Sequence, residues 1–394
     1  MNRIDTISNF IQSKVDEYGN AYMAYEAAGR ELYDKLVSGK ESSSNISIRA
    51  LFEGCAKQVG IDYIDYGDTD MVKEAVSKSA FPNITKYVIA SVMIPDFEYR
   101  KEQLSDLYTE GEASNSDSEE LYGFTGEEGL EFVPAQGPVS FTDFGEKKCK
   151  VVLGKFQRAI GLTKELIYSD KTGQILDKAR RIGEKFADQF EEFIIETIEI
   201  RPRTLFGFET ASDLNCAVFD GTKVTQSNFY SADHSSLSYM GSQVNKNLIT
   251  TALGTSGVAE ALRYAASMVD ENGDKITVKP SVLLVHSAKA ATAWQMLYSP
   301  MQYDTTNNAK NPFGPQGPYA FKLYHTPYLN ASDDWYLGDF KKQLVVLFWE
   351  KFNVTKTSAN SEMSFMNDIV VAYKASVGFG AAHRDYRYII KSHP

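Results

Sequence analysis

The chain has 394 residues, of which 43% are hydrophobic, 24% charged and 12% aromatic. This composition is that of a folded protein with a large core, and it excludes an intrinsically disordered chain. No apolar run reaches the ~18 residues of a membrane helix, so no membrane contact is expected. The length is more than one core usually fills, which predicts two or three packed units.

The cysteines are few and scattered. Cys55, Cys149 and Cys216 form neither a Cys-x-x-Cys pair nor a cluster with histidine. An odd, dispersed set of this kind predicts no disulfide framework and no zinc site. It is typical of a protein kept in a reducing cytoplasm.

The net charge of −11 arises from 41 basic and 52 acidic residues, and it is concentrated in one segment. Residues 102–146 contain twelve acidic residues and no lysine or arginine, whereas the rest of the chain is nearly neutral. Either this acidic segment is a solvated loop, or it docks on a basic surface of another subunit. The overall balance argues against tight nucleic-acid binding, which needs lysine and arginine to neutralise phosphates.

Docking would bring acidic residues of this segment to basic residues of another copy. The candidate interface residues are Glu119, Glu120, Glu127, Glu128, Lys147, Lys148, Lys178, Arg180, Arg181 and Lys185. The first two lysines directly follow the acidic segment, and the last four bases belong to the exposed face of a predicted helix. Each exposed ion pair contributes only ~0–1 kcal/mol, so such a contact would act through many subunits.

Residues 1–80 are predicted to be helical. Apolar residues recur at helical spacing through the first 32 residues. A polar loop at 39–45 breaks the pattern, and further helices are predicted at 47–59 and 70–79.

Residues 81–165 are predicted to be mostly extended. Residues 84–94, which lie between two prolines, fit either a strand or a buried helix. Strands are predicted at 130–133, 149–153 and 156–162. Residues 148–156 resemble the returning arm of a long hairpin, which has so few core residues that it needs a surface to lie on.

The clearest element is a long amphipathic helix over 171–199. Its apolar residues step by three or four positions and form one continuous stripe from Ile175 to Thr197. Ser169 or Asp170 is expected to cap its start, and Pro202 to end it.

The remainder of the chain mixes helices and strands and then becomes β-rich. The expected elements are a helix at 256–269, a turn at 270–274, a strand at 281–285, a helix at 288–298 and a loop at 299–318. Residues 341–394 are expected to be β. Apolar residues alternate with other residues over 369–379, which predicts a half-buried strand.

The sequence lacks the common signatures of catalysis, cofactor binding and metal binding. It contains no His-Glu-x-x-His motif, no Gly-x-Ser-x-Gly elbow and no phosphate-binding loop. Residues 378–383 imitate the start of a dinucleotide fingerprint, but His383 stands where its third glycine is required. Their glycines are expected to relieve crowding in a strand. No catalytic residue, cofactor or metal is therefore expected.

For several residues a role in metal binding or catalysis is an alternative to a structural role. Residues 270–274 hint at a calcium loop, but Ser281 occupies the position that needs glutamate, so a turn is expected. Asp117 and its acidic neighbours on the loop are a minor alternative for binding a divalent ion. His286 is interpreted as a structural histidine after a buried strand. An enzyme that uses scattered carboxylates, such as a hydrolase, stays open as a second class of function.

The order of elements resembles a known family. The stretches that carry the resemblance are 160–170, which leads into the long helix, 279–286, which leads into the next helix, and 377–387 near the C-terminus. Together they are similar to the major capsid proteins of tailed double-stranded DNA bacteriophages, which have the Hong Kong 97-like fold. The resemblance covers roughly residues 80–394 and implies an α+β fold class.

The resemblance also implies a division of the chain. It gives an N-terminal helical arm (1–80), a first peripheral-domain segment (81–105), an extended acidic β-hairpin loop (106–165), a peripheral-domain spine helix (166–204), an axial domain (205–340) and a peripheral-domain β return (341–394). Lys147 and Lys148 lie on the extended loop, where some relatives place a cross-linking lysine. That chemistry is not carried over, because its partner asparagine and assisting acid cannot be located in the sequence.

The function that the resemblance implies is structural and not enzymatic. The protein would assemble with itself, in hexamers and pentamers, into an icosahedral shell around packaged double-stranded DNA, which it would contact only weakly. Portal, scaffold or decoration proteins would be its other partners. The shell would assemble in the host cytoplasm, and the protein would be part of the finished virion. An encapsulin-like nanocompartment shell of the same fold and another virion part are the alternatives that remain beside the hydrolase.

Overall fold

The structure is a computed structural model of the chain. It describes all residues except 1–3, 43–45, 125–145, 171–173, 202–217, 220–221, 224–228, 233, 235–244, 271–272, 303–309, 316 and 358–368. For residues 4–6, 123–124, 146–149, 218–219 and 222–223 it describes the backbone alone.

The chain forms two compact units, each built from three separate segments. Unit 1 comprises Met1–Glu102, Lys155–Phe190 and Glu350–Gly378, and unit 2 comprises Gln103–Gly154, Glu191–Trp349 and Phe379–Pro394. Mixed helices and strands confirm the α+β class predicted from the sequence.

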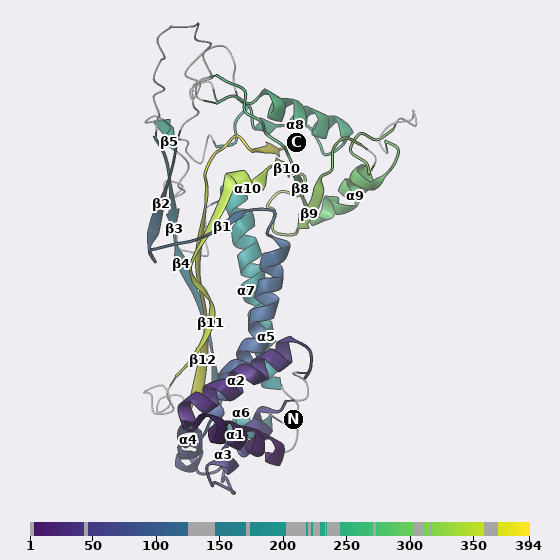
Figure 1. Cartoon of the computed structure of the whole chain (residues 1–394). Helices are drawn as coiled ribbons and strands as arrows, with labels where there is room; N and C mark the ends of the chain where they lie inside the picture. Colours follow the sequence, from purple (N-terminus) through teal and green to yellow (C-terminus); the bar gives the residue numbers. More distant parts are fainter. Residues whose placement is uncertain are drawn as a thin grey trace. The chain divides into compact units, whose positions relative to one another are not determined.

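Four helices open unit 1, where the sequence predicts three (Figure 1). They are α1 (Ile4–Tyr18), α2 (Ala21–Val37), α3 (Ile48–Gln58) and α4 (Thr69–Lys78). The periodicity that runs through the first 32 residues is divided between α1 and α2. Gly19 has a φ of 64°, and the side chain of Asn20 accepts hydrogen bonds from the backbone of Tyr22 and Met23, which starts the second helix.

The fifth helix decides between the two alternatives that the sequence left for residues 84–94: they form a buried helix and not a strand. The extended structure predicted for 81–165 begins only after this helix. α5 covers Phe81–Gln103 and contains Pro95 in its interior. Nearly every residue from Phe81 to Met93 is buried, on all sides of the helix. A helix that is apolar all round is stable only inside a protein, so tertiary burial overrides the proline and the β-branched residues that suggested a strand.

The long helix is confirmed, with a shorter helix in front of it. α6 covers Lys164–Ser169 and α7 covers Gln174–Ile198. Asp170 joins them to α3: its Oδ1 accepts from the backbone of Ile175 at 3.4 Å, and its Oδ2 accepts from the backbone of Ile48 at 2.9 Å. One buried carboxylate therefore serves the first turns of two helices.

The end of α7 carries unusual backbone geometry. Ile200 has a φ of 57°, and it is the one non-glycine residue with positive φ in the described part of the chain. The buried carboxylate of Glu199 pairs with Arg201 at 2.6 Å and accepts from the backbone of Asn330 at 3.1 Å. Burial raises the pKa of this carboxyl group. These contacts hold a conformation that costs a β-branched residue ~1–2 kcal/mol.

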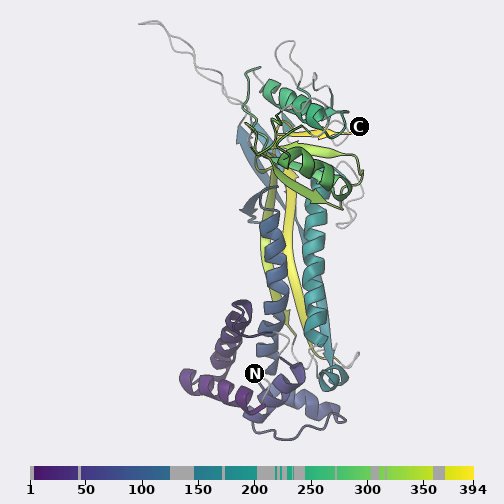
Figure 2. The same cartoon turned by 90° about the vertical axis from the view of Figure 1, so that its right-hand side faces the viewer.

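Helices α5 and the first part of α7 run side by side in unit 1 (Figure 2). A Cβ atom on Gly183 would lie 2.8 Å from the backbone oxygen of Met93, so only glycine allows this approach. Further along the contact, the rings of Phe97 and Phe190 lie 5.4 Å apart, and Phe97 also packs on Phe352 at 5.1 Å.

The strands β1 (Thr109–Glu112), β4 (Gly154–Thr163), β11 (Leu344–Lys356) and β12 (Ile369–His383) form a four-stranded sheet in the order β1-β11-β12-β4. β1 pairs with β11 in parallel. β12 is a strand as predicted, but its residues are buried at nearly every position and do not alternate. At Gly380 a Cβ would lie 2.2 Å from the backbone oxygen of Val152, so crowding requires glycine at this position, as the sequence predicts.

The predicted hairpin is also present. β2 (Ser118–Phe124) pairs antiparallel with β3 (Glu146–Val152), and the short strands β5 (Val218–Phe219) and β6 (Thr222–Lys223) extend the same sheet. The strand predicted at 130–133 lies outside the described residues.

The remaining sheet of unit 2 has five strands in the order β7-β13-β10-β8-β9, which Figure 1 shows beside helices α8 and α9. The strands are β7 (Leu248–Ile249), β8 (Val282–His286), β9 (Lys322–Thr326), β10 (Trp335–Gly338) and β13 (Ile389–Ser392); the helices are α8 (Thr255–Ser267), α9 (Ala290–Tyr298) and the short α10 (Phe340–Gln343). The predicted helices and strand of this region are confirmed. Residues of α8, α9, β8 and β10 share one apolar core.

Buried polar side chains tie the C-terminal segment into unit 2. Arg387 and Asp385 form a paired set of hydrogen bonds, the shortest 2.6 Å, and both side chains are buried. Asn247 donates to the backbone oxygens of Phe229 and Tyr386. Removing one member of such a network would leave a buried polar group unpaired.

The close approach at Gly183 yields a stability prediction. Gly183→Ala adds a methyl group against Met93, and overpacking of this kind costs ~1–3 kcal/mol, whereas the gain in helix propensity returns at most ~1 kcal/mol. We expect a net loss of about 1 kcal/mol in the free energy of unfolding, measured by chemical denaturation. Gln189→Ala, on the exposed face of the same helix, is the control and should not lower the denaturation midpoint. Equal stability of the alanine variant and the original would contradict the contact.

Candidate assembly surfaces

The base of the β2–β3 hairpin lies on the protein's own chain. Val151 is fully buried and packs with Val345 and Leu347 of β11, and Leu121 adds to the same cluster. The other face of the hairpin is exposed: Tyr122 is 70% accessible. The surface that the sequence required for the hairpin is therefore supplied, at its base, by the same unit.

Two of the four predicted acidic interface residues are described. Glu119 Oε2 accepts from the backbone of Ser114 at 2.7 Å, and Glu120 Oε2 accepts from the hydroxyl of Tyr122 at 2.7 Å. In the strand register Glu120 stands opposite Lys150. Glu127 and Glu128 lie outside the described residues, and Lys147 and Lys148 are described only by their backbone in β3.

The other four predicted basic residues lie on α7. Lys178, Arg180, Arg181 and Lys185 are exposed, and Lys185 pairs with Asp188 at 3.3 Å. They belong to unit 1, whereas Glu119 and Glu120 belong to unit 2. Pairing between these two sets in different copies stays a prediction.

The beginning of the acidic segment is neutralised within its own unit, which sequence reasoning missed. Asp106 pairs with Lys341 at 3.0 Å and with Lys322 on its other oxygen. The two ammonium groups lower the pKa of the Asp106 carboxyl below its ordinary value of 3.8. Because more than 200 residues separate the partners in sequence, only the fold brings them together.

An exposed aromatic pair on α9 was also missed. Trp294 is 58% accessible and Tyr298 is 48% accessible, and their rings stack with centroids 5.6 Å apart. The opposite side of the helix, with Ala293, Met296 and Leu297, is buried in the core. Because tryptophan and tyrosine are enriched at interface hot spots, this pair is a candidate contact. Its i, i+4 spacing on a helix was the available signal.

The residues weighed for chemistry have structural roles. His286 Nδ1 accepts from the backbone of Ala288 at 3.1 Å and caps a short 3₁₀ turn. Asp270 Oδ1 accepts from the backbone of Asp274 at 2.8 Å, which makes the predicted turn. Within the described ranges, no group of three or more His, Cys, Asp or Glu residues could hold a metal ion. The helices of those ranges include none that is long and apolar enough to cross a membrane.

Comparison with known proteins decides the family. The profile of the family described as "Phage capsid protein" matches residues 150–392, which is more than half of the chain. The chain belongs to this family of phage capsid proteins. The match confirms the resemblance to phage capsid proteins drawn from the sequence, and it does not favour the nanocompartment or the hydrolase. Among curated proteins no sequence matches.

Three solved structures are similar to this capsid protein at low sequence identity. "Capsid of native GTA particle computed with C5 symmetry" is 13% identical, covering 74% of this chain and 90% of that one, with a TM-score of 0.47. The structure titled "Mycobacterium phage Cain" is 11% identical over 73% and 88% of the two chains, with a TM-score of 0.44. "Capsid structure of the Cyanophage P-SCSP1u" is 10% identical over 74% and 87%, with a TM-score of 0.43.

The ion pairs of Asp106 give this capsid protein a pH-dependent contribution to stability. A carboxyl group with a lowered pKa in the folded state stabilises the protein above its unfolded pKa and loses this effect as the pH falls. Asp106→Asn should therefore lower the free energy of unfolding at pH 7 by about 0.5–1 kcal/mol. The difference from the original should shrink as the pH falls below 3.8, and also in high salt. A difference that is the same at acid and neutral pH would refute this assignment.

Proposed function

We propose that this capsid protein is the major shell subunit of a tailed double-stranded DNA bacteriophage. Copies of it would assemble, as hexamers and pentamers, into a closed icosahedral shell around packaged DNA. The observation that carries the proposal is the family match over residues 150–392, which includes segments of both compact units. In this role the protein acts by binding copies of itself and is not an enzyme.

The Hong Kong 97-like fold and its division of the chain belong to the same proposal. The element order supports it: the helical arm of α1 to α4 is followed by the β2–β3 hairpin and then by the long helix α7. The axial domain, 205–340, would hold β7 to β10 with α8 and α9, and the β return, 341–394, would hold β11 to β13. The last strand of the return, β13, pairs into the five-stranded sheet. The first peripheral-domain segment, 81–105, would then be the buried helix α5.

A shell that DNA must enter and fill needs other protein partners. A portal protein, and a scaffold or decoration protein, would bind the assembled copies. Contact with the DNA would be weak and non-specific, because the chain has a net charge of −11 and does not supply the excess of lysine and arginine that phosphate binding needs.

Closed particles are the expected outcome when the purified protein is concentrated, with or without a scaffold protein. The exposed pair Trp294 and Tyr298 should take part, so Trp294→Ala should raise the concentration at which particles appear without lowering the thermal unfolding temperature. Sedimentation velocity and negative-stain microscopy provide the readout. Tyr319→Ala, which removes another exposed aromatic ring of unit 2, is the control. A protein that stays a monomer under all conditions would contradict the proposed function.

Docking of the acidic segment on a neighbouring copy predicts the effect of salt. If the acids of residues 102–146 pair with Lys178, Arg180, Arg181 and Lys185 of another copy, screening should lower the particle yield as salt rises. Glu119→Gln with Glu120→Gln should lower the yield in the same direction. A solvated loop predicts the reverse, since salt or neutralisation would relieve repulsion. A yield that rises steadily with salt would show that the loop does not dock.

A further inference from the structure

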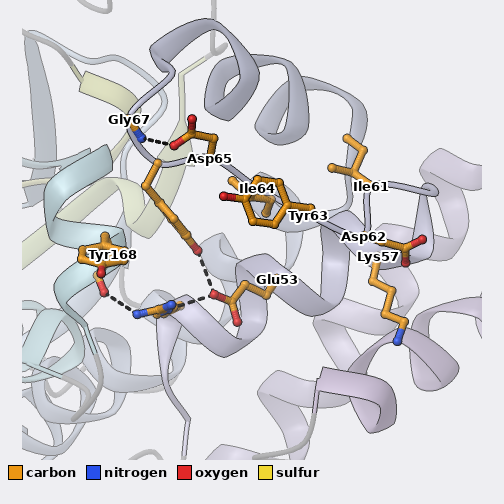
Figure 3. A pocket seen from close by; sticks show the side chains of 11 residues that line it. Glu53, Lys57, Ile61, Asp62, Tyr63, Ile64, Asp65, Gly67 and Tyr168 are labelled. Atoms are coloured by element: carbon orange, nitrogen blue, oxygen red, sulfur yellow. Dashed lines mark hydrogen bonds and ion pairs between the residues drawn. The ribbon is translucent and has the colours of Figure 1, made fainter.

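Unit 1 contains an open pocket of about 870 Å³ at the outer side of α3 (Figure 3). Its walls are α3, the loop at 61–67 and Tyr168 of α6. Tyrosine rings and carboxylates dominate the lining. This combination suits a cation, because ring faces and carboxylates both attract positive charge.

One wall of the pocket already holds a cation. The guanidinium group of Arg49 lies over the rings of Tyr66 and Tyr168, at 5.5 Å and 4.7 Å from their centroids. It donates to Glu53 Oε1 at 2.8 Å and to the backbone oxygen of Tyr168 at 3.2 Å. The hydroxyl of Tyr66 donates to the same Glu53 oxygen at 3.1 Å. The charged and hydroxyl groups of this wall are therefore paired with one another.

The loop wall offers the same kinds of group to the pocket. Tyr63 is 74% accessible, and Asp62 and Asp65 are both exposed. Asp65 Oδ1 accepts from the backbone of Gly67 at 2.9 Å, which fixes the loop conformation. Glu53 is paired with Arg49, so its charge is already balanced. The two aspartates are then left with one cation of the lining, Lys57, and the pocket carries an excess of negative charge.

We infer that this pocket receives a basic side chain from a second copy of the chain, supplied by Lys178 and Arg181 of its helix α7. These two residues then serve the pocket and not the acidic segment, which keeps Arg180 and Lys185 as its partners on α7. The inference rests on the proposed function, since it needs several copies in contact. Lys178 and Arg181 are exposed and lie three residues apart, so they project from one face of α7. Their positive charge complements Asp62 and Asp65, and arginine is the cation that best stacks on a tyrosine ring.

The two halves of this contact are different surfaces of one unit. Every copy therefore presents one pocket and one basic face, and the contact is head-to-tail. A head-to-tail contact whose rotation closes generates a ring of copies, whereas a self-complementary contact would stop at a dimer. A ring-forming contact is what capsomers of a shell require.

The test compares three variants by the concentration at which particles first appear. The pocket variant is Asp62→Lys with Tyr63→Ser, and the face variant is Lys178→Glu with Arg181→Glu. The control is Glu98→Lys with Tyr99→Ser, which changes another exposed acid and tyrosine of unit 1, on α5, in the same way. All substituted side chains are exposed, so folding should be retained, and circular dichroism checks it.

The pocket and face variants should each raise the threshold concentration by about fivefold or more, and the control should not. A chain that combines both sets of substitutions restores opposite charges across the contact and should recover most of the loss. The inference is overturned if either variant assembles like the control, or if the combined chain assembles no better than the single variants. Failure of the original chain to form particles would instead refute the proposed function.

Discussion

Unit 1 depends on one backbone contact, the approach of α5 to α7 at Gly183. Because no side chain separates the helices there, apolar residues of α5 are buried on every side and Phe97 reaches the rings of Phe190 and Phe352. α5 contains an internal proline and several β-branched residues, so it has little tendency to form a helix alone. Its helical state is a product of burial, and the close approach at Gly183 contributes to that burial.

The sequence correctly predicts the helices that are marked by a pattern of neighbouring residues, such as an apolar stripe or a polar loop. The stripe from Ile175 to Thr197 identifies α7, and the polar loop after α2 separates the helices of the N-terminal arm. At α5 the sequence left a strand and a buried helix open, and burial decides for the helix and keeps the second proline inside it. The prediction fails for the pattern within β12, because alternation presumes one solvent-exposed face and this strand is buried along almost its whole length.

The sequence predicts the candidate contact surfaces less well than it predicts the fold. Charge counting found the acidic segment, but the pairing of Asp106 with Lys322 and Lys341 joins residues far apart in the chain and depends on tertiary structure. The exposed pair on α9 could not be separated from its buried neighbours without knowing which side of the helix faces the core. The pocket beside α3 depends likewise on Tyr168 of α6, whose ring no local pattern places next to Tyr66.

The double role of Asp170 constrains which residues that position tolerates. Each carboxylate oxygen accepts a hydrogen bond from a different helix, α3 or α7, and the side chain is almost completely buried. Asparagine has the same shape but only one accepting atom, so it could serve only one of the two helices. Glutamate keeps both oxygens on a longer stem that would not fit the same buried space. A second mutation near one helix could not replace the hydrogen bond lost at the other helix. Replacement of Asp170 during evolution would therefore require several simultaneous changes.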